Sequence, residues 1–151
     1  MKPSLKLTNA VHILVYIANT KPGERVVSKD IAQSVNTNPS RVRALMSDLF
    51  SAGLIEREED ENFGRPKLAK KPEDISMADI LEAINEDAKV FPLDTKVSDD
   101  CEVAKKINPT LSFYYDQMEE HLLSLIKDMR FSDILDRFYA DENALSALKE
   151  A

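Results

Sequence analysis

Residues 26–54, VVSKDIAQSVNTNPSRVRALMSDLFSAGL, decide the fold of this chain. Ser28 predicts the start of a short helix, because a serine hydroxyl can accept an unpaired backbone N–H at that position. Residues 36–38 predict a turn, since short polar side chains bond their own backbone. Asn38 predicts the start of a second helix, with Pro39 in its first turn, where a missing N–H costs nothing.

The second predicted helix, residues 39–52, has one apolar and one polar face and ends at Gly53, a typical left-handed stop. Its apolar stripe, with intervals of three and four, consists of Val42, Leu45, Met46 and Leu49. Its opposite face carries Ser40, Arg41, Arg43, Ala44, Ser47 and Asp48. This is the anatomy of a helix-turn-helix, whose second helix enters the DNA major groove with its N-terminal residues foremost. Two short amphipathic helices also occur in all-α cores and protein-interaction modules, so the pattern alone leaves both alternatives open.

Composition favours a helical chain without an internal disulfide. The 151 residues make one domain or a small domain plus an extension, and three glycines favour helix over sheet. No apolar run approaches the roughly 18 residues of a membrane span, and no signal-peptide pattern opens the chain. The single cysteine fits a reducing cytoplasm.

Charge is distributed unequally along the chain. Residues 1–71 carry 12 Lys/Arg and 8 Asp/Glu, a net charge of +4, whereas residues 72–151 carry 8 Lys/Arg and 19 Asp/Glu, a net charge of −11. The asymmetry indicates that one end faces phosphate and the other faces water or protein. A charge of +4 permits DNA binding without proving it.

Two segments flank the helix-turn-helix. Helical spacing of apolar residues predicts a first helix from Lys6 or Thr8 to about Asn19. After Gly53, two short alternating segments, 54–58 and 67–70, predict the strands of a wing. Arg65 and Lys67 are its natural phosphate or minor-groove contacts. The acidic run 58–61 disfavours contact between the wing tip and DNA, because carboxylates repel the phosphate backbone.

The C-terminal half predicts further helices around one long helix. Ser76 caps a helix with Met77, Ile80, Leu81 and Ile84 on its apolar face, and a polar loop with an apolar anchor at residues 91–93 follows. Cys101 opens a short helix, 102–107, that Asn108-Pro109 stops. Ser132 caps a last helix, 133–139, with Ile134, Leu135 and Phe138 facing inward, and Asp141 caps a C-terminal tail.

The longest helical pattern, residues 110–130, carries a heptad-like seam. Its members, spaced four, three, four, three and four residues apart, are Leu111, Tyr115, Met118, Leu122, Leu125 and Met129. A long helix packed on its own domain is one explanation. Because no other helix of the chain matches its length, we expect a partner helix from a second copy. The sequence therefore predicts a mainly α fold with a small β-wing: a winged helix-turn-helix domain, 1–75, and a helical linker with a C-terminal dimerisation helix, 76–151.

Taken in this order, the segments resemble the Rrf-two family of bacterial winged-helix regulators. The resemblance rests on LTNAVHILVYIA, on IAQSVNTNPSRVRALMSDLFSAGLI, on LAKKPEDIS with its DI continuation, and on FSDIL. VNTNPSRVR and CEV are most similar to the YwnA-like branch, whose members lack an iron–sulfur cluster. The resemblance implies a homodimer that crosses its long helices and binds a promoter, usually to repress it.

The resemblance also assigns roles to residues. It implies base reading by Ser40 and Arg41, at the start of the recognition helix next to Asn38 and Pro39. It implies backbone contacts by the set Ser28, Arg43 and Ser47, and a wing contact by Arg65. The wing departs from the family pattern, since it is acidic and Pro66 follows Gly64-Arg65 where glycines are usual.

Cofactors and catalysis are not expected. A [2Fe–2S] centre needs about four protein ligands, usually thiolates, and this chain offers only Cys101. Cys101 is a candidate redox sensor or a structural cysteine, and neighbouring charges of both signs leave its reactivity open. No phosphate loop, metal-spaced ligand set or nucleophile with an evident base indicates an enzyme. The competing hypothesis is a winged-helix interaction or adaptor module without sequence-specific DNA binding.

Overall fold

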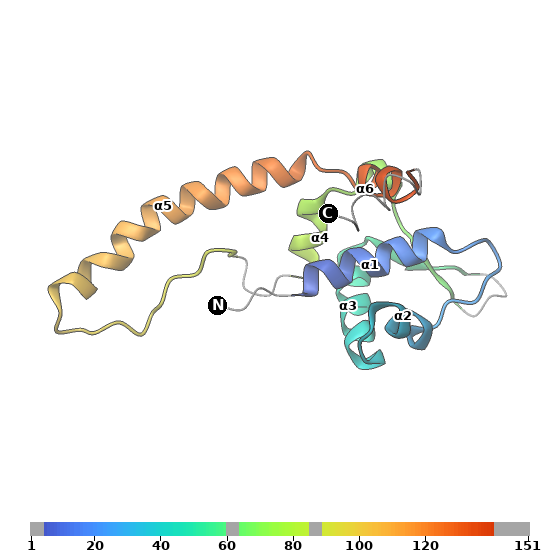
Figure 1. The fold of residues 1–151 in the computed structure, drawn as a ribbon, viewed down its shortest axis with the longest axis horizontal. Coiled ribbons are helices and arrows are strands. Elements are labelled where there is room, and N and C mark those ends of the chain that lie inside the picture. Colours follow the sequence, from blue (N-terminus) through green and yellow to red (C-terminus); the bar gives the residue numbers. More distant parts are fainter. Residues whose placement is uncertain (1–4, 60–63, 85–88, 141–151) are drawn as a thin grey trace, which may run out of the picture.

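The described residues form a mainly helical fold with one two-stranded sheet, as the sequence predicts. A computed structural model describes residues 5–59, 64–84 and 89–140. In chain order the elements are α1 (Lys6–Asn19), α2 (Ser28–Val35), α3 (Pro39–Ser51), β1 (Ile55–Arg57), β2 (Pro66–Leu68), the 3-10 turn η1 (Pro72–Asp74), α4 (Met77–Ile84), α5 (Glu102–Lys127) and α6 (Phe131–Phe138). Figure 1 shows α5 projecting from a body that the other elements build together.

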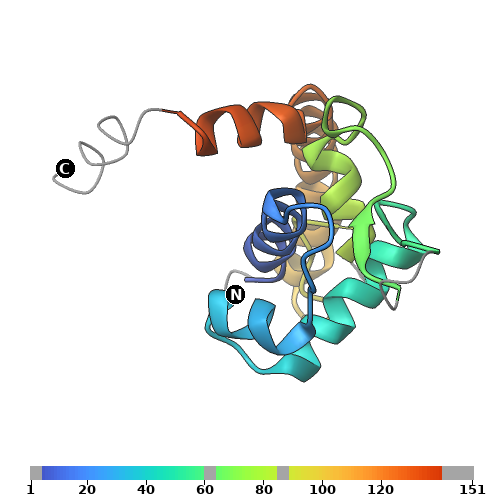
Figure 2. The ribbon, with the colours of Figure 1, turned by 90° about the vertical axis from the view of Figure 1, so that its right-hand side faces the viewer.

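The core is organised around α1, which contacts α2, α3, α4 and β2. In Figure 2, which is turned by 90°, α1 lies in the middle with α2 below it and α6 above. The predicted α3 stripe is buried, and it packs in one cluster with Ala10, Ile13, Leu14 and Ile17 of α1. The same cluster includes Ile80 of α4 and Phe131 of α6, so the apolar core continues past the boundary predicted after residue 75.

The helix-turn-helix has the predicted turn and stop. Asn36 adopts the left-handed conformation with φ 59°, and the Arg41 N–H donates to Asn38 Oδ1 at 2.9 Å, which confirms the cap of α3. Gly53 has φ 73°, as a helix stop requires. The Ser28 cap was wrong: Val27 occupies the cap position of α2, because its carbonyl already accepts the Ile31 N–H at 3.2 Å. The Ser28 hydroxyl therefore lies one residue too far along the helix to cap it.

The wing consists of two antiparallel strands in which Ile55 pairs with Leu68 and Arg57 with Pro66. The second strand begins one residue earlier than predicted, at Pro66. Proline can occupy the first position of a strand, where its missing N–H leaves no ladder bond unmade. Half of the acidic run, residues 60–61, lies outside the described residues.

The start of α4 and the end of α5 are joined by backbone hydrogen bonds. The Asp79 N–H donates to Ser76 Oγ at 3.1 Å and the Ser76 N–H donates to Asp79 Oδ2 at 2.9 Å, which confirms the Ser76 cap. The Met77 N–H donates to the Met129 carbonyl and the Phe131 N–H donates to the Ile75 carbonyl, both at 2.8 Å. These bonds fix the long helix to the helix-turn-helix core.

The two helices predicted across residues 102–130 are one helix of 26 residues, so the predicted stop at Asn108-Pro109 was wrong. Proline removes only the hydrogen bond to the Lys105 carbonyl, which lies on an exposed residue where water can replace it. Asn108 does not break the helix either, since its Nδ2 donates to the Asp94 carbonyl at 2.7 Å. None of the described helices, α5 included, has a stretch apolar enough to cross a membrane.

The last helix differs from the prediction at both ends. α6 begins at Phe131, with Arg130 at the cap position and its N–H donating to Asp133 Oδ2 at 3.2 Å, so Ser132 is not the cap. The buried Phe131 ring sets this start. Phe138, predicted to face inward, is 48% exposed, since Phe131 and Leu135 already form the buried face. The predicted cap at Asp141 lies outside the described residues.

The segment before α5 runs back along that helix (Figure 1). Glu119 holds it, because one carboxylate oxygen accepts the N–H of Val90 at 2.6 Å and the N–H of Phe91 at 2.7 Å. The rings of Phe91 and Tyr115 lie 6.2 Å apart. This confirms a loop with an apolar anchor, and it places part of the predicted seam against its own chain.

Candidate nucleic-acid interface

The polar face of α3 is exposed from Ser40 to Ser47. Val42, Leu45, Met46 and Leu49 pack inward, which leaves Ser40, Arg41, Arg43 and Ser47 exposed on the other side. Arg43 Nη2 donates to Ser40 Oγ at 3.3 Å, one turn away. Within the described part of the chain, no hydrogen bond or ion pair engages the Arg41 guanidinium. The face thus offers a guanidinium and hydroxyls at the helix N-terminus, where backbone N–H groups also favour anions.

The remaining predicted residues of the helix-turn-helix lie at the starts of α2 and α3. Asn38 is exposed, and its carboxamide oxygen is used by the cap. Pro39 and Ser28 are half-buried, and Ser28 is the first residue of α2. The structure therefore brings the predicted helix-turn-helix residues to the starts of α2 and α3.

The two predicted wing cations have different surroundings. Lys67 is exposed and its Nζ lies 3.5 Å from Glu56 Oε1 across the strand pair. The Arg65 side chain is only 10% exposed, and its guanidinium donates to the carbonyls of Lys21 and Glu24 and to the Glu58 carboxylate. This geometry does not support the expectation that Arg65 is displayed toward DNA.

Sequence reasoning missed a second wing arginine. The Arg57 guanidinium carbon lies 4.7 Å from the centroid of the Phe50 ring, and Arg57 Nη1 donates to the Gly64 carbonyl at 3.1 Å. The contact joins β1 to the C-terminal part of α3. An arginine two residues after a buried strand residue is an ordinary surface pattern, so the sequence held no signal for it.

Five of the seven exposed large apolar residues of α5 form a stripe that includes Met118 and Leu125 of the predicted seam, whereas Phe113 and Leu123 lie outside it. Leu111, Tyr115 and Leu122 of the seam are half-buried, and Met129 lies beyond the helix. The exposed apolar stripe consists of Val103, Ile107, Tyr114, Met118 and Leu125, which are between 38% and 71% exposed. At about 100° per residue, their spacing places them on one face. Cys101 is exposed at the cap position of the same helix.

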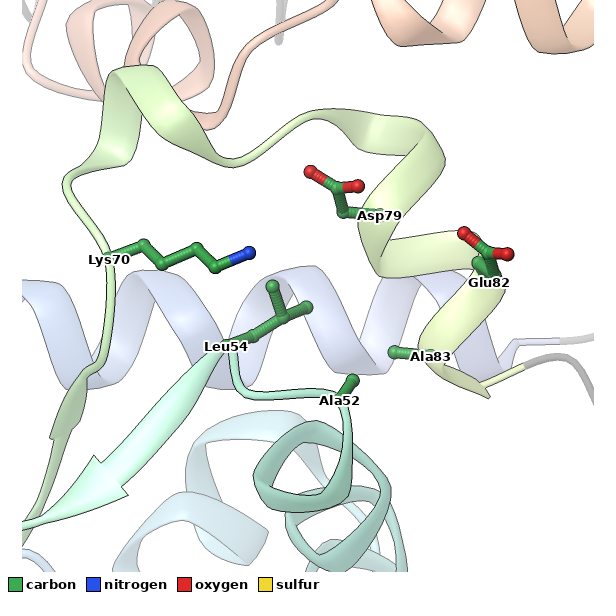
Figure 3. A pocket seen from close by; sticks show the side chains of 6 residues that line it. All are labelled: Ala52, Leu54, Lys70, Asp79, Glu82 and Ala83. Carbon is green, nitrogen blue, oxygen red and sulfur yellow. The ribbon is translucent and has the colours of Figure 1, made fainter.

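A shallow hollow of about 280 Å³ lies between the end of α3 and α4. Figure 3 shows Lys70 reaching across it toward α4, which carries Asp79 and Glu82. Asp79 is already engaged in the cap of α4. The lining holds one positive and two negative side chains, and one of the two carboxylates is engaged by the helix cap. The charges of the hollow therefore indicate no particular class of ligand.

A protein-family model described as Rrf2, iron-dependent transcriptional regulator, matches residues 4–137. This chain belongs to the Rrf2 (Rrf-two) family. It is a transcriptional regulator with a winged helix-turn-helix, and the family is one of regulators rather than enzymes. Membership favours DNA binding over the protein-interaction alternative.

Individual relatives agree with this Rrf2 membership. The chain is 28% identical over 136 residues to the HTH-type transcriptional regulator YwnA of Bacillus subtilis, covering 89% of this chain and 97% of YwnA. The crystal structure of a protein described as DNA-binding matches with 28% identity and a TM-score of 0.66, covering 86% of this chain and 98% of that one. The cysteine regulator CymR of B. subtilis shares the fold, with 22% identity and a TM-score of 0.62 over 93% of this chain and 99% of CymR.

The sequence of this Rrf2 protein does not supply the thiolate ligands of a cysteine-bound iron–sulfur cluster. Protein iron–sulfur clusters use about four ligands, mostly cysteine thiolates. The sequence has one cysteine, Cys101, so even two copies of the chain would supply too few thiolates. Among the described residues, no group of three or more His, Cys, Asp or Glu side chains is placed to hold a metal ion.

Proposed function

We propose that this protein represses transcription from a promoter as a cytoplasmic homodimer without an iron–sulfur cluster. Each copy places α3 in a DNA major groove. The observation that carries the proposal is the exposed polar face of α3, whose opposite face is buried in the core. The exposed residues are Ser40, Arg41, Arg43 and Ser47. A side chain that is fixed by a packed helix can select a base edge, whereas a mobile side chain loses that precision.

The residues divide into base-reading and backbone-binding sets. Arg41 lies in the first turn of α3 and is exposed, and a guanidinium can donate two hydrogen bonds to guanine O6 and N7. Ser40 lies beside it at the same helix end. The phosphate and sugar contacts come from Ser28, Asn38, Pro39, Arg43, Ser47 and Lys67. The unequal charge of the two halves supports an orientation in which residues 1–71, with a net charge of +4, face the DNA.

The exposed apolar stripe of α5 supports the homodimer. A row of large exposed apolar side chains along a projecting helix is the kind of surface that marks a protein–protein contact. A second copy of α5 supplies a helix of matching length and the same stripe, which is the self-complementary arrangement of a two-fold interface. Two α3 helices in such a dimer would read half-sites about one DNA turn, roughly 34 Å, apart or a multiple of it.

The test is DNA binding by the full-length protein. A duplex is selected from a random-sequence pool by the wild-type protein, and its affinity is then measured by fluorescence anisotropy at several salt concentrations. The affinity should fall steeply with salt, because bound counterions are released from the phosphates. Arg41→Ala should weaken the selected duplex by about 1–3 kcal/mol and relax the preference at one base position.

Arg137→Ala is the matched control, because Arg137 is an exposed arginine of α6, away from α3. It should leave affinity and sequence preference unchanged. If the selection yields no preferred duplex, the protein is not a sequence-specific DNA-binding regulator. If Arg41→Ala keeps the wild-type preference at every position, Arg41 does not read a base.

A further inference from the structure

Arg65 is the most extensively bonded cation in the described part of the wing. Its Nη1 donates to the Lys21 carbonyl at 2.6 Å and to the Glu24 carbonyl at 3.2 Å, and its Nη2 lies 2.9 Å from Glu58 Oε1. The Arg65 Nε–H is buried without an acceptor among the described residues. Burying an N–H group without an acceptor costs free energy, so the other bonds of Arg65 must hold it in place. Those bonds join the segment of Arg65 to Glu58 and to the turn that contains Lys21 and Glu24.

The acceptors of Arg65 belong to the turn that leads from α1 into α2. In that turn the Glu24 N–H donates to the Lys21 carbonyl at 3.1 Å, and the Lys21 N–H donates to a Glu24 carboxylate oxygen at 3.2 Å. The turn sets the direction in which the chain enters α2. By bonding both of its terminal carbonyls, Arg65 fixes this turn against the wing.

Arg57 holds the wing from the other direction. It stacks on Phe50 of α3 and bonds the Gly64 carbonyl, next to Arg65. Gly64 has φ 68°, a left-handed conformation that favours glycine, and its carbonyl is the one that Arg57 bonds. The wing is thus attached by one arginine to the turn before α2 and by another to the recognition helix α3.

We propose that the wing is a brace that fixes the orientation of the helix-turn-helix, with Arg65 as its principal positioning residue rather than a DNA contact. Building on the proposed DNA-binding function, this inference assigns to Arg65 a role within the protein. The Arg65–Glu58 pair also removes a carboxylate charge from the field that would otherwise repel phosphate.

The residue type separates the two roles of Arg65. A phosphate contact can be made by any cation in reach, so a lysine would largely replace the arginine. A positioning residue that bonds two carbonyls and a carboxylate at once needs the planar fork of a guanidinium, which lysine lacks. Arg65→Lys is therefore more informative than Arg65→Ala, and it also carries the test if the alanine variant fails to fold.

Duplex binding is measured by anisotropy for the wild type, Arg65→Lys and Arg65→Ala, with the duplex selected by the wild-type protein. Both variants should bind about tenfold more weakly, because the unbraced helix-turn-helix must be ordered on binding. Their salt dependence should equal that of the wild type, since no phosphate contact is lost. A lost phosphate contact would instead lower the slope of log K against log salt by about 0.9.

Arg25→Ala is the matched control for charge, because Arg25 is an exposed arginine at the same turn. Arg25→Ala should bind the selected duplex more tightly than either Arg65 variant does. The brace is overturned if Arg65→Lys binds as the wild type does, if Arg65→Ala lowers the salt slope by one contact, or if Arg25→Ala loses as much affinity as Arg65→Lys.

Hydrogen exchange in the free protein separates the brace from the proposed function. The Glu24 amide, bonded to the Lys21 carbonyl, and the Glu58 amide, bonded to the Arg65 carbonyl, should exchange faster in Arg65→Lys than in the wild type. Unchanged exchange rates would refute the brace, whatever the result of the duplex-binding measurement. Faster exchange in a protein whose wild type selects no duplex would support the brace and refute DNA binding.

Discussion

Replacing Met118 with glutamate should separate the proposed homodimer into single chains. Met118 lies in the exposed apolar stripe of α5 and is 43% exposed in one copy. Full burial of such a side chain contributes about 2 kcal/mol, so the exposed part contributes roughly 1 kcal/mol per chain, or about 2 kcal/mol for the pair. Two carboxylates introduced at a two-fold interface add at least about 2 kcal/mol for desolvation and repulsion.

The total of about 4 kcal/mol predicts a rise of roughly a thousandfold in the dimer dissociation constant. Sedimentation velocity over a range of protein concentrations measures it. Leu123→Glu is the matched control, because Leu123 is 40% exposed on the same helix. Its position, about 140° around the helix from Met118, is outside the stripe. This control should remain a dimer.

The interface is assigned to the wrong face of α5 if Met118→Glu sediments like the wild type, or if Leu123→Glu dissociates as readily. A wild-type protein that stays a single chain at high concentration would refute the dimer itself. Circular dichroism should show the same helical content for both variants, since each residue is already exposed in one copy.

Three further predictions concern stability and Cys101. Phe131→Ala should lower the free energy of unfolding by about 3–5 kcal/mol in urea, because its ring is fully buried. Phe138→Ala should change it by less than about 1 kcal/mol, and equal losses would contradict the observed burial. Asn38→Ala should cost about 1 kcal/mol by removing the cap bond to the Arg41 N–H, whereas Asn38→Ser should retain most of it; thermal unfolding compares them. Cys101→Ser should keep the wild-type affinity for the selected duplex, because Cys101 is exposed at the cap position of α5, away from α3. A loss of binding by the Cys101→Ser variant under reducing conditions would exclude a purely sensory role.

The sequence by itself determined the features that depend on a few neighbouring residues. The apolar stripe of α3, the cap at Asn38, the stop at Gly53 and the cap at Ser76 all formed as predicted. Each is decided within one or two helical turns. The same local patterns placed the exposed polar face of α3 opposite its buried stripe.

Only the tertiary structure decided features that depend on residues far apart in the chain. Pro109 predicts a break, yet α5 continues through it. Arg65 belongs to the wing in sequence, but two of its three acceptors, the carbonyls of Lys21 and Glu24, lie more than 40 residues earlier. One side of α5 is covered through contacts with the preceding loop, in which Glu119 accepts the N–H groups of Val90 and Phe91. A local pattern specifies how a segment folds, but the partners of a buried charge or an apolar face are set by which segments the fold brings together.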